Sequence, residues 1–446
     1  MIKKPTLVVL VCAILLGGVY YYFNRKGGDA EKPAAETFNA AFTVPAADVT
    51  SVTVNHPAKP DQPAIQINKT GGAWRIAQPV ETAADSAAVD QAVDSLTSAR
   101  VTQTESGAPD RLKAFGLDPP KVSVQIQAKS GGKHTLLIGD KVFDGNSVYT
   151  VVDGAQSVSV LPGSVLTSFD KSLDDFRDHT ILPLSSDQVA SFTLKNPSGE
   201  LALTKTKDQW NFTKPAETRA DQDSIGAILM AIQSGKFTGV GSEKPDDLGK
   251  YGLASPAVSL TATDDAGKKL TLIVGKKEGN DYFARDMSRP MIFRVPGGLY
   301  TQLTKTFTDL RDKKVLHFDA ADLTRLEIHN DHGTMVASSA GSDAWTFESP
   351  AAQKGKSSIS TKLFDPLSNL NSSQIVDHPG ADLMSKLANP AIEAILTDKN
   401  KKTVTLKISK PAGDVVYAQA SDSPSVYKLK KQDFDSLNVD PSTLVE

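Results

Sequence analysis

The sequence predicts an α+β protein: an N-terminal transmembrane helix followed by three tandem repeats of a module that combines an antiparallel sheet with helices. Three observations lead to this prediction. An 18-residue run near the N-terminus contains no charged residue. The three tryptophans are spaced by 136 and 135 residues, and a proline follows each of them five residues later. Strand-like and helix-like segments recur around each tryptophan-proline pair, at a period too long for a solenoid.

The uncharged run, Thr6 to Phe23, is expected to be an uncleaved signal-anchor. At about 1.5 Å per residue, a helix of this length nearly crosses a hydrocarbon core of about 30 Å. Three tyrosines at its end, Tyr20 to Tyr22, suit the membrane interface. A cleaved signal peptide is the alternative, although no cleavage site of small residues follows the run directly. The single cysteine, Cys12, lacks the preceding small residue that a lipoprotein site needs.

The charges that flank the run indicate its orientation. Lys3 and Lys4 precede it, and Arg25 and Lys26 follow it. Together with the short N-terminal tail, this pattern slightly favours a cytoplasmic N-terminus and therefore an extracytoplasmic body. A body without cysteine is compatible with an oxidising compartment. The net charge of −3 and the lack of long basic runs argue against a nucleic-acid partner.

Composition and repeat boundaries divide the chain into five parts. They are the anchor (1–26), a linker rich in Ala, Gly and Pro (27–47), the first repeat (48–184), the second repeat (185–318) and a divergent third repeat (319–446).

Each repeat is expected to open with three strands. The first strand has alternating apolar residues, which predict a half-buried strand over 49–54, 189–194 and 323–328. The third strand contains the tryptophan and ends at the proline. The pairs are Trp74 with Pro79, Trp210 with Pro215, and Trp345 with Pro350.

A helix is predicted after the proline in every repeat. Asp85 and Asp221 are expected to be its N-caps in the first two repeats. Apolar residues at helical spacing follow both of them and form one buried stripe. In the third repeat Pro366 interrupts this stripe, so the helix should be shorter or kinked.

A second short helix, closed by Gly116 or Gly252, is followed by a meander of strands in the first two repeats. These repeats then end on an amphipathic helix and an Arg-Asp pair. The pairs are Arg177-Asp178 and Arg311-Asp312. They are expected to form salt bridges between adjacent repeats, with a contact to a partner protein as the alternative. The third repeat lacks both the glycine and the Arg-Asp pair.

No motif indicates catalysis, a cofactor or a metal. Phosphate-binding loops and nucleophile elbows are absent from the sequence. The segment His329 to His332, with His317 upstream, is the only candidate metal cluster. It falls at a hairpin turn of the repeat, where polar residues are expected for other reasons. We therefore expect no catalytic residue, no cofactor and no metal site.

The ordered set of motifs resembles the bacterial domain-of-unknown-function family numbered 4340. The motifs are Trp74-x4-Pro79, Ala84-Asp85, the run Phe115 to Pro120, Leu137-Ile138-Gly139 and Arg177-Asp178. The resemblance covers residues 49 to 316 well and is weaker in the third repeat. It implies an N-terminally anchored envelope protein that works beside ABC transporter components of the gliding-motility type. It carries over no catalytic residue.

These observations lead us to expect a non-enzymatic accessory or scaffold protein. It would be a single-pass protein of the bacterial inner membrane, with a cytoplasmic N-terminus, a periplasmic body and membrane-protein partners in an ABC-type transport system. The alternative is a periplasmic binding module for glycan, peptidoglycan or lipid, which exposed aromatic side chains on one face would favour. A hydrolase of unfamiliar type would need a pocket with convergent ionisable groups.

Overall fold

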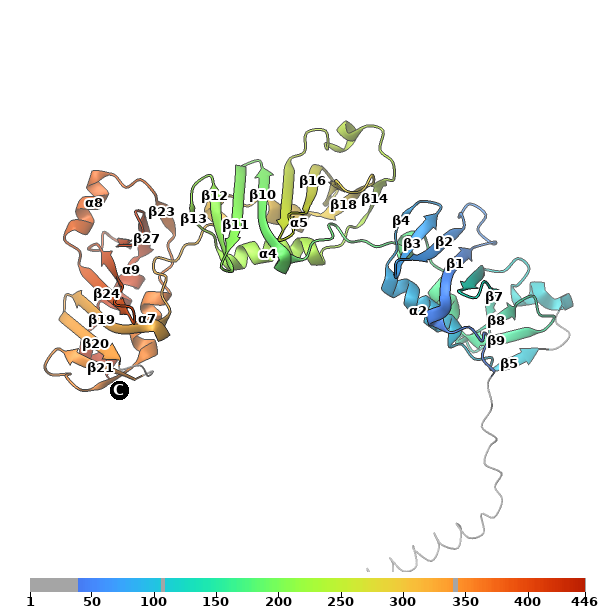
Figure 1. Ribbon diagram of the computed structural model, residues 1–446, viewed down its shortest axis with the longest axis horizontal. Helices are drawn as coiled ribbons and strands as arrows, with labels where there is room; N and C mark the ends of the chain where they lie inside the picture. Colours follow the sequence, from blue (N-terminus) through green and yellow to red (C-terminus); the bar gives the residue numbers. More distant parts are fainter. Residues whose placement is uncertain (1–38, 106–108, 340–343, 446) are drawn as a thin grey trace, which may run out of the picture. The chain divides into compact units, whose positions relative to one another are not determined.

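Figure 1 shows the computed structural model, which describes residues 39–105, 109–339 and 344–445. Within these residues the chain forms three nine-stranded antiparallel sheets and eight α-helices. Each sheet is built from one consecutive stretch of chain that contains one tryptophan. The expected α+β class and the repeated sheet module are therefore confirmed, with strands predominating.

The predicted transmembrane helix (1–26) lies outside the described residues, as does most of the linker (27–47). Among the residues that the structure describes, no helix has both the length and the apolar character needed to cross a membrane.

The first sheet has the strand order β4-β3-β2-β1-β6-β7-β8-β9-β5. Its strands are β1 (Val49–Asn55), β2 (Ile65–Thr70), β3 (Ala73–Gln78), β4 (Thr82–Ala83), β5 (Gln103–Glu105), β6 (Val122–Ala128), β7 (Lys133–Lys141), β8 (Ser147–Val152) and β9 (Val158–Pro162). The opening strand β1 thus pairs with its hairpin partner on one side and with the meander on the other.

The second sheet has the equivalent order, β13-β12-β11-β10-β15-β16-β17-β18-β14. Its strands are β10 (Val189–Asn196), β11 (Gly199–Thr206), β12 (Gln209–Lys214), β13 (Thr218–Arg219), β14 (Gly239–Ser242), β15 (Val258–Asp264), β16 (Lys269–Glu278), β17 (Asp281–Asp286) and β18 (Ile292–Pro296).

The third sheet repeats this order again, as β22-β21-β20-β19-β24-β25-β26-β27-β23. Its strands are β19 (Leu323–Asn330), β20 (Gly333–Ser339), β21 (Ala344–Ser349), β22 (Ser357–Ile359), β23 (Gln374–Val376), β24 (Ile392–Asp398), β25 (Thr403–Ile408), β26 (Val415–Ala420) and β27 (Val426–Lys430).

The three repeats share strand register as well as strand order. A 3-10 turn precedes the opening strand each time: η1 (Ala46–Asp48), η4 (Ser186–Gln188) and η6 (Ala320–Asp322). One residue into that strand, an irregularity of the β-bulge type interrupts its pairing with the meander in all three sheets. A common register places the same face of every opening strand in the core.

The helix predicted after the proline is present in every repeat. It is α2 (Ser86–Thr97), α4 (Gln222–Ser234) and α7 (Ser360–Ser368). In α2 and α4 the predicted apolar stripe is buried with the strands in one hydrophobic core per repeat. The third helix is shorter and contains Pro366, as the sequence predicted.

A second, smaller cluster of apolar residues lies on the other face of the meander in the first two repeats. It is covered by the 3-10 turns η2 (Pro109–Phe115) and η5 (Leu248–Tyr251), which Gly116 and Gly252 close in the left-handed conformation. A Cβ on Gly275 would lie 2.2 Å from the carbonyl oxygen of Tyr251. The recurring glycines therefore permit a close contact between turn and strand. In the third repeat, helix α8 (Ala381–Ala388) follows the edge strand instead.

The closing segment differs from the prediction of one amphipathic helix. It consists of two short helical pieces in each repeat. They are α3 (Ser164–Phe169) with η3 (Asp174–Phe176), α5 (Gly297–Leu303) with α6 (Phe307–Leu310), and α9 (Lys431–Leu437) with η7 (Pro441–Leu444). In the second repeat Thr306 and Asp309 form a capping box, so α6 starts as a separate helix.

The contacts of the chain divide it into two compact units, with the division between Thr180 and Ile181. The second unit contains the second and third sheets. Ile181, Leu182 and Leu184 belong to the core of the second sheet, and Val315 and Leu316 belong to the core of the third. The packing of both repeats therefore begins a few residues before the boundaries expected at 185 and 319.

Candidate functional site: the closure of the second repeat

The recurring motifs of a repeat meet where its closing segment returns to the strand that carries the tryptophan. In the second repeat, Ala220 donates its backbone N–H to the carbonyl of Trp210, and Asp221 donates to the carbonyl of Leu310. Asp312 then donates to the carbonyl of Arg219 at 3.1 Å. We call this region, formed by 219–221 and 310–312, the closure of the second repeat.

The first repeat has the same backbone arrangement. Ala84 donates to the carbonyl of Trp74, Asp85 to that of Phe176, and Asp178 to that of Ala83. The tryptophan strand, the helix cap and the Arg-Asp pair, which are far apart in sequence, are thus brought together in both repeats. These motifs recur together because they form the same closure in both repeats.

The side chains of the recurring residues serve the folding of each repeat. Trp74, Trp210 and Trp345 are buried, with 1%, 6% and 2% of their surface exposed. Each tryptophan strand ends at the residue before its proline, Pro79, Pro215 or Pro350. Asp85 accepts hydrogen bonds from the backbone amides of Ala87 and Ala88, and Asp221 accepts one from Ser224. The two carboxylates therefore cap their helices.

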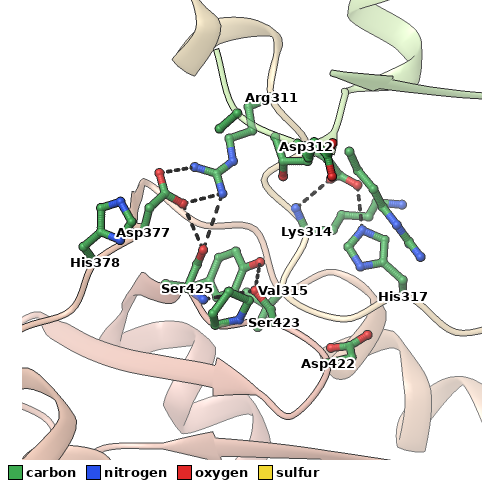
Figure 2. Close-up of a pocket in the computed structure, with 16 residues that line it drawn as sticks. Arg311, Asp312, Lys314, Val315, His317, Asp377, His378, Asp422, Ser423 and Ser425 are labelled. Atoms are coloured by element: carbon green, nitrogen blue, oxygen red, sulfur yellow. Dashed lines mark hydrogen bonds and ion pairs between the residues drawn. The ribbon is translucent and has the colours of Figure 1, made fainter. Parts of the chain in front are cut away.

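The side chain of Arg311 extends from the closure to the third repeat. Its guanidinium group contacts both carboxylate oxygens of Asp377, at 2.8 and 2.6 Å. Ser425 donates a hydrogen bond to the same carboxylate at 2.9 Å, and Arg311 is 3.5 Å from the Ser425 hydroxyl. Figure 2 shows these three side chains pointing toward one another. This bidentate geometry is the strong form of an arginine-carboxylate pair.

Asp312 stabilises the turn that follows. Its carboxylate accepts hydrogen bonds from the backbone amide of Lys314 at 2.9 Å and from the ring of His317 at 2.6 Å. Three residues after Asp312, the backbone belongs to the third repeat: Val315 donates to the carbonyl of Leu370. The chain therefore passes from one repeat to the next without a free linker.

Electrostatics favour the charged forms of both aspartates. The hydrogen bond from Arg311 lowers the pKa of Asp377, burial opposes it, and Ser425 adds a smaller lowering effect. Burial tends to raise the pKa of Asp312, but hydrogen bonds from His317 and Lys314 outweigh it, and the pKa is lower than usual. Both carboxylates are therefore charged acceptors at neutral pH.

A polar cavity of about 440 Å³ lies beside these groups, within the second compact unit. The second repeat supplies its walls from 216–219 and 311–312, and the junction with the third repeat supplies Lys314, Val315 and His317. The third repeat supplies the remaining walls from 377–378, 422–425 and Tyr427. The ionisable groups around it are Glu217, Arg219, Arg311, Asp312, Lys314, His317, Asp377, His378, Asp422 and Tyr427.

The chemistry available in the cavity is limited by these pairings. Arg311 is neutralised by Asp377, and the Ser425 hydroxyl is already a donor to that carboxylate. The carboxylate that accepts from Ser425 is also held by Arg311, which lowers its pKa, so it is a weak base for activating the serine as a nucleophile. The arrangement is suited to holding a polar joint together.

Both side chains of the Arg-Asp pair of the first repeat are engaged in contacts. Only 2% of the surface of Arg177 is exposed, and its Nε lies 3.5 Å from Asp174. Asp178 accepts hydrogen bonds from the backbone amide and hydroxyl of Thr180. Asp178 thus stabilises the turn after the closure, as Asp312 does.

The histidines considered for metal binding are separated. His329 contacts Glu327 at 2.8 Å and Thr334 at 2.8 Å, at the start of the β19–β20 hairpin. His317 is paired with Asp312 in the closure. Within the described ranges, no group of three or more potential ligands is placed to hold a metal ion.

Sequence reasoning did not find Asp377 and Ser425, although they complete the closure. Asp377 follows the edge strand β23, and an acidic residue, Glu243, follows the equivalent strand β14. An acidic residue at the same position of two repeats is the sequence signal that could have pointed to Asp377. The partner of Asp377 is 66 residues away, so no local pattern indicated the pair.

A family model described as "Domain of unknown function (DUF4340)" matches residues 74–214 and 210–387. Since the matches span well over half of the chain, the protein belongs to this family. Each match begins at a tryptophan, Trp74 or Trp210, so the first runs from β3 to the end of β12. Each matched segment therefore includes the closure of one repeat and the opening strands of the next. A comparison with curated proteins finds no match.

Proposed function

We propose that the protein is a non-enzymatic accessory subunit of a bacterial envelope complex, anchored in the inner membrane by residues 1–26. Its body is periplasmic, and its partners are membrane proteins of an ABC-type transport system. The resemblance described for the sequence, together with membership of the family, supports this role. The uncharged run from Thr6 to Phe23 supports the anchor.

The observation that carries the proposal is that the residues shared by the repeats have structural roles. The tryptophans are buried, the aspartates cap helices, and the Arg-Asp pairs lie in the closures. A series of enzyme domains would be expected to repeat a cluster of reactive groups. This chain instead repeats residues that stabilise a sheet module, which suits a protein that presents surfaces to partners.

The burial of the tryptophans also bears on the alternative role. A glycan-binding or lipid-binding face would present aromatic rings to the ligand, whereas Trp74, Trp210 and Trp345 are all buried. The structure therefore offers no support for a tryptophan-lined binding face.

Purification of the full chain from gently solubilised membranes tests the proposal. We expect membrane subunits of an ABC-type transporter to copurify in stoichiometric amounts. The control is the same body secreted behind a cleavable signal peptide in place of residues 1–26. If the full chain brings down no membrane protein that the secreted body lacks, the proposed role is wrong.

A further inference from the structure

The end of the opening strand carries a polar side chain that contacts the first closing helix in each repeat. In the second repeat, the side-chain amide of Asn196 donates to the carbonyls of Leu303 and Lys305, at 3.0 and 2.9 Å. In the third repeat, Asn330 donates to the carbonyls of Leu437 and Val439, at 3.2 and 3.1 Å. The asparagine thus connects the first strand to the end of α5 or α9.

His56 occupies this position in the first repeat. The preceding residue, Asn55, pairs with Ser123 on β6, as Lys195 pairs with Ser259 on β15. Only 4% of the surface of His56 is exposed. The histidine is therefore as buried as a core residue, in a place where the other repeats have a group that never titrates.

The ring of His56 faces the C-terminal end of α3. Its Nε2 lies 3.5 Å from the carboxylate of Asp170, the residue that follows the helix. Among the described residues, neither ring nitrogen has a partner that meets hydrogen-bond geometry, although the carbonyl of Phe169 lies nearby. The other charged group facing the ring is Lys59, which contacts Asp170 at 3.0 Å.

Burial is the largest effect on the pKa of His56, and it lowers this pKa. Asp170 and the Phe169 carbonyl oppose the effect of burial, whereas Lys59 adds to it. The net direction is downward, so the folded repeat favours the neutral ring. A group of this kind contributes stability above its unfolded pKa of about 6.5, and the contribution is lost as the pH falls through its folded pKa.

We propose that His56 makes the first repeat acid-sensitive: protonation of its ring weakens the contact between the end of β1 and α3, while Asn196 and Asn330 keep the equivalent contacts in the other repeats. A protonated ring must either become hydrated or form a close ion pair with Asp170. Asp170 is already engaged by Lys59. Either change displaces the end of α3 from its position against the strand.

Hydrogen exchange of the full chain in detergent tests this proposal, because the other repeats provide internal controls. Protection is compared between about pH 7.5 and about pH 5.5, on either side of the ordinary histidine pKa, after correction for intrinsic exchange rates. We expect protection over 164–170 to fall on the order of tenfold at the lower pH. Protection over 297–304 and 431–438 should stay constant. His56→Asn, which installs the residue of the other repeats, should abolish the fall.

Two results would overturn the proposal. One is an equal loss of protection in the wild type and in His56→Asn, or in all three helices. The other is a nuclear magnetic resonance titration of the wild-type His56 ring with a midpoint at or above about 6.5, which also decides the matter if the variant does not fold. Neither measurement depends on the transporter partner, so failure here is distinct from failure of the proposed function. Sensitivity to acid matters in the cell only if the body faces a compartment of variable pH, as proposed above.

Discussion

At the scale of single residues, Arg311 shows how a closure can join two repeats. Its backbone is bridged to Ala220 of the second repeat, and its side chain is paired with Asp377 of the third. The side chain of Arg311 is 10% exposed, whereas that of Asp377 is 43% exposed. The pair is therefore partly shielded from water, and its contribution to stability should exceed that of a surface ion pair.

Arg311→Ala should lower the free energy of unfolding of the second unit by about 1–2 kcal/mol, because it leaves Asp377 without its charged donor. Chemical denaturation measures this loss. The matched control is Arg325→Ala, which removes an exposed arginine paired with Glu348 and Glu327 and should change stability by less than about 1 kcal/mol. Equal effects of the two substitutions would contradict the assignment of Arg311 as a joint between repeats.

The stability conferred by this pair should also depend on pH. Asp377 has a lowered folded pKa, chiefly because of Arg311, so its contribution is present above the unfolded value of about 3.9 and is lost as the pH falls through the folded value. The difference in stability between wild type and Arg311→Ala should be constant near neutral pH and should shrink below about pH 4. A difference that grows on acidification would refute this account.

At the scale of elements, the sequence predicted a strand or helix best where residues close in sequence determine its start or end. The prolines end the tryptophan strands, and the aspartates cap α2 and α4. The third helix α7 is shorter, but because it starts later; it continues past Pro366 to Ser368. The edge strands β4 and β13 have two residues each, too few to show an alternating pattern. The other edge strand, β5, has three residues and pairs with β9, which lies more than 50 residues away in the sequence. The family could be inferred because its motifs are ordered, whereas Asp377 and Ser425 required coordinates.

Asp221→Ala should destabilise the second repeat by about 1 kcal/mol, because the amide of Ser224 loses its capping acceptor. Asp223→Ala is the matched control, since it removes an exposed carboxylate from the first turn of the same helix. Comparing the thermal unfolding of the two variants distinguishes the effect of the capping hydrogen bond from the effect of losing a negative charge. The capping role would be disproved if Asp223→Ala were the more harmful change.

Gly275→Ala should destabilise the second repeat by about 1–3 kcal/mol, because the new methyl group would overlap the carbonyl oxygen of Tyr251. Gly226→Ala, in helix α4, is the control. A Cβ there meets no atom within 4 Å, and alanine favours the helix by up to about 1 kcal/mol. Denaturation curves should therefore shift in opposite directions. A tolerated Gly275→Ala would show that the close contact between turn and strand is not required.

At the scale of the whole molecule, the second and third repeats are joined at consecutive residues. Asp312 donates its amide to Arg219 in the second repeat, and Lys313 accepts from the amide of Ser372 in the third. Insertion of a short Gly-Ser segment between Asp312 and Lys313 should turn one cooperative unfolding transition of this unit into two, as seen by calorimetry. The same insertion at the β15–β16 turn, near Gly267, should leave one transition. Two transitions in the unmodified chain would show that the junction does not couple the repeats.

The central claim is that the residues shared by the repeats build the modules and do not themselves act on a ligand or partner. The most direct measurement uses the full chain with Trp210→Phe, extracted gently from membranes. It gives the amount of membrane partner recovered per folded chain. Trp210 is packed edge-on against Phe192 at 5.4 Å, so the variant should be less stable and less abundant. The account predicts the wild-type amount of partner for every chain that remains folded. Loss of the partner from a folded and abundant variant would contradict it.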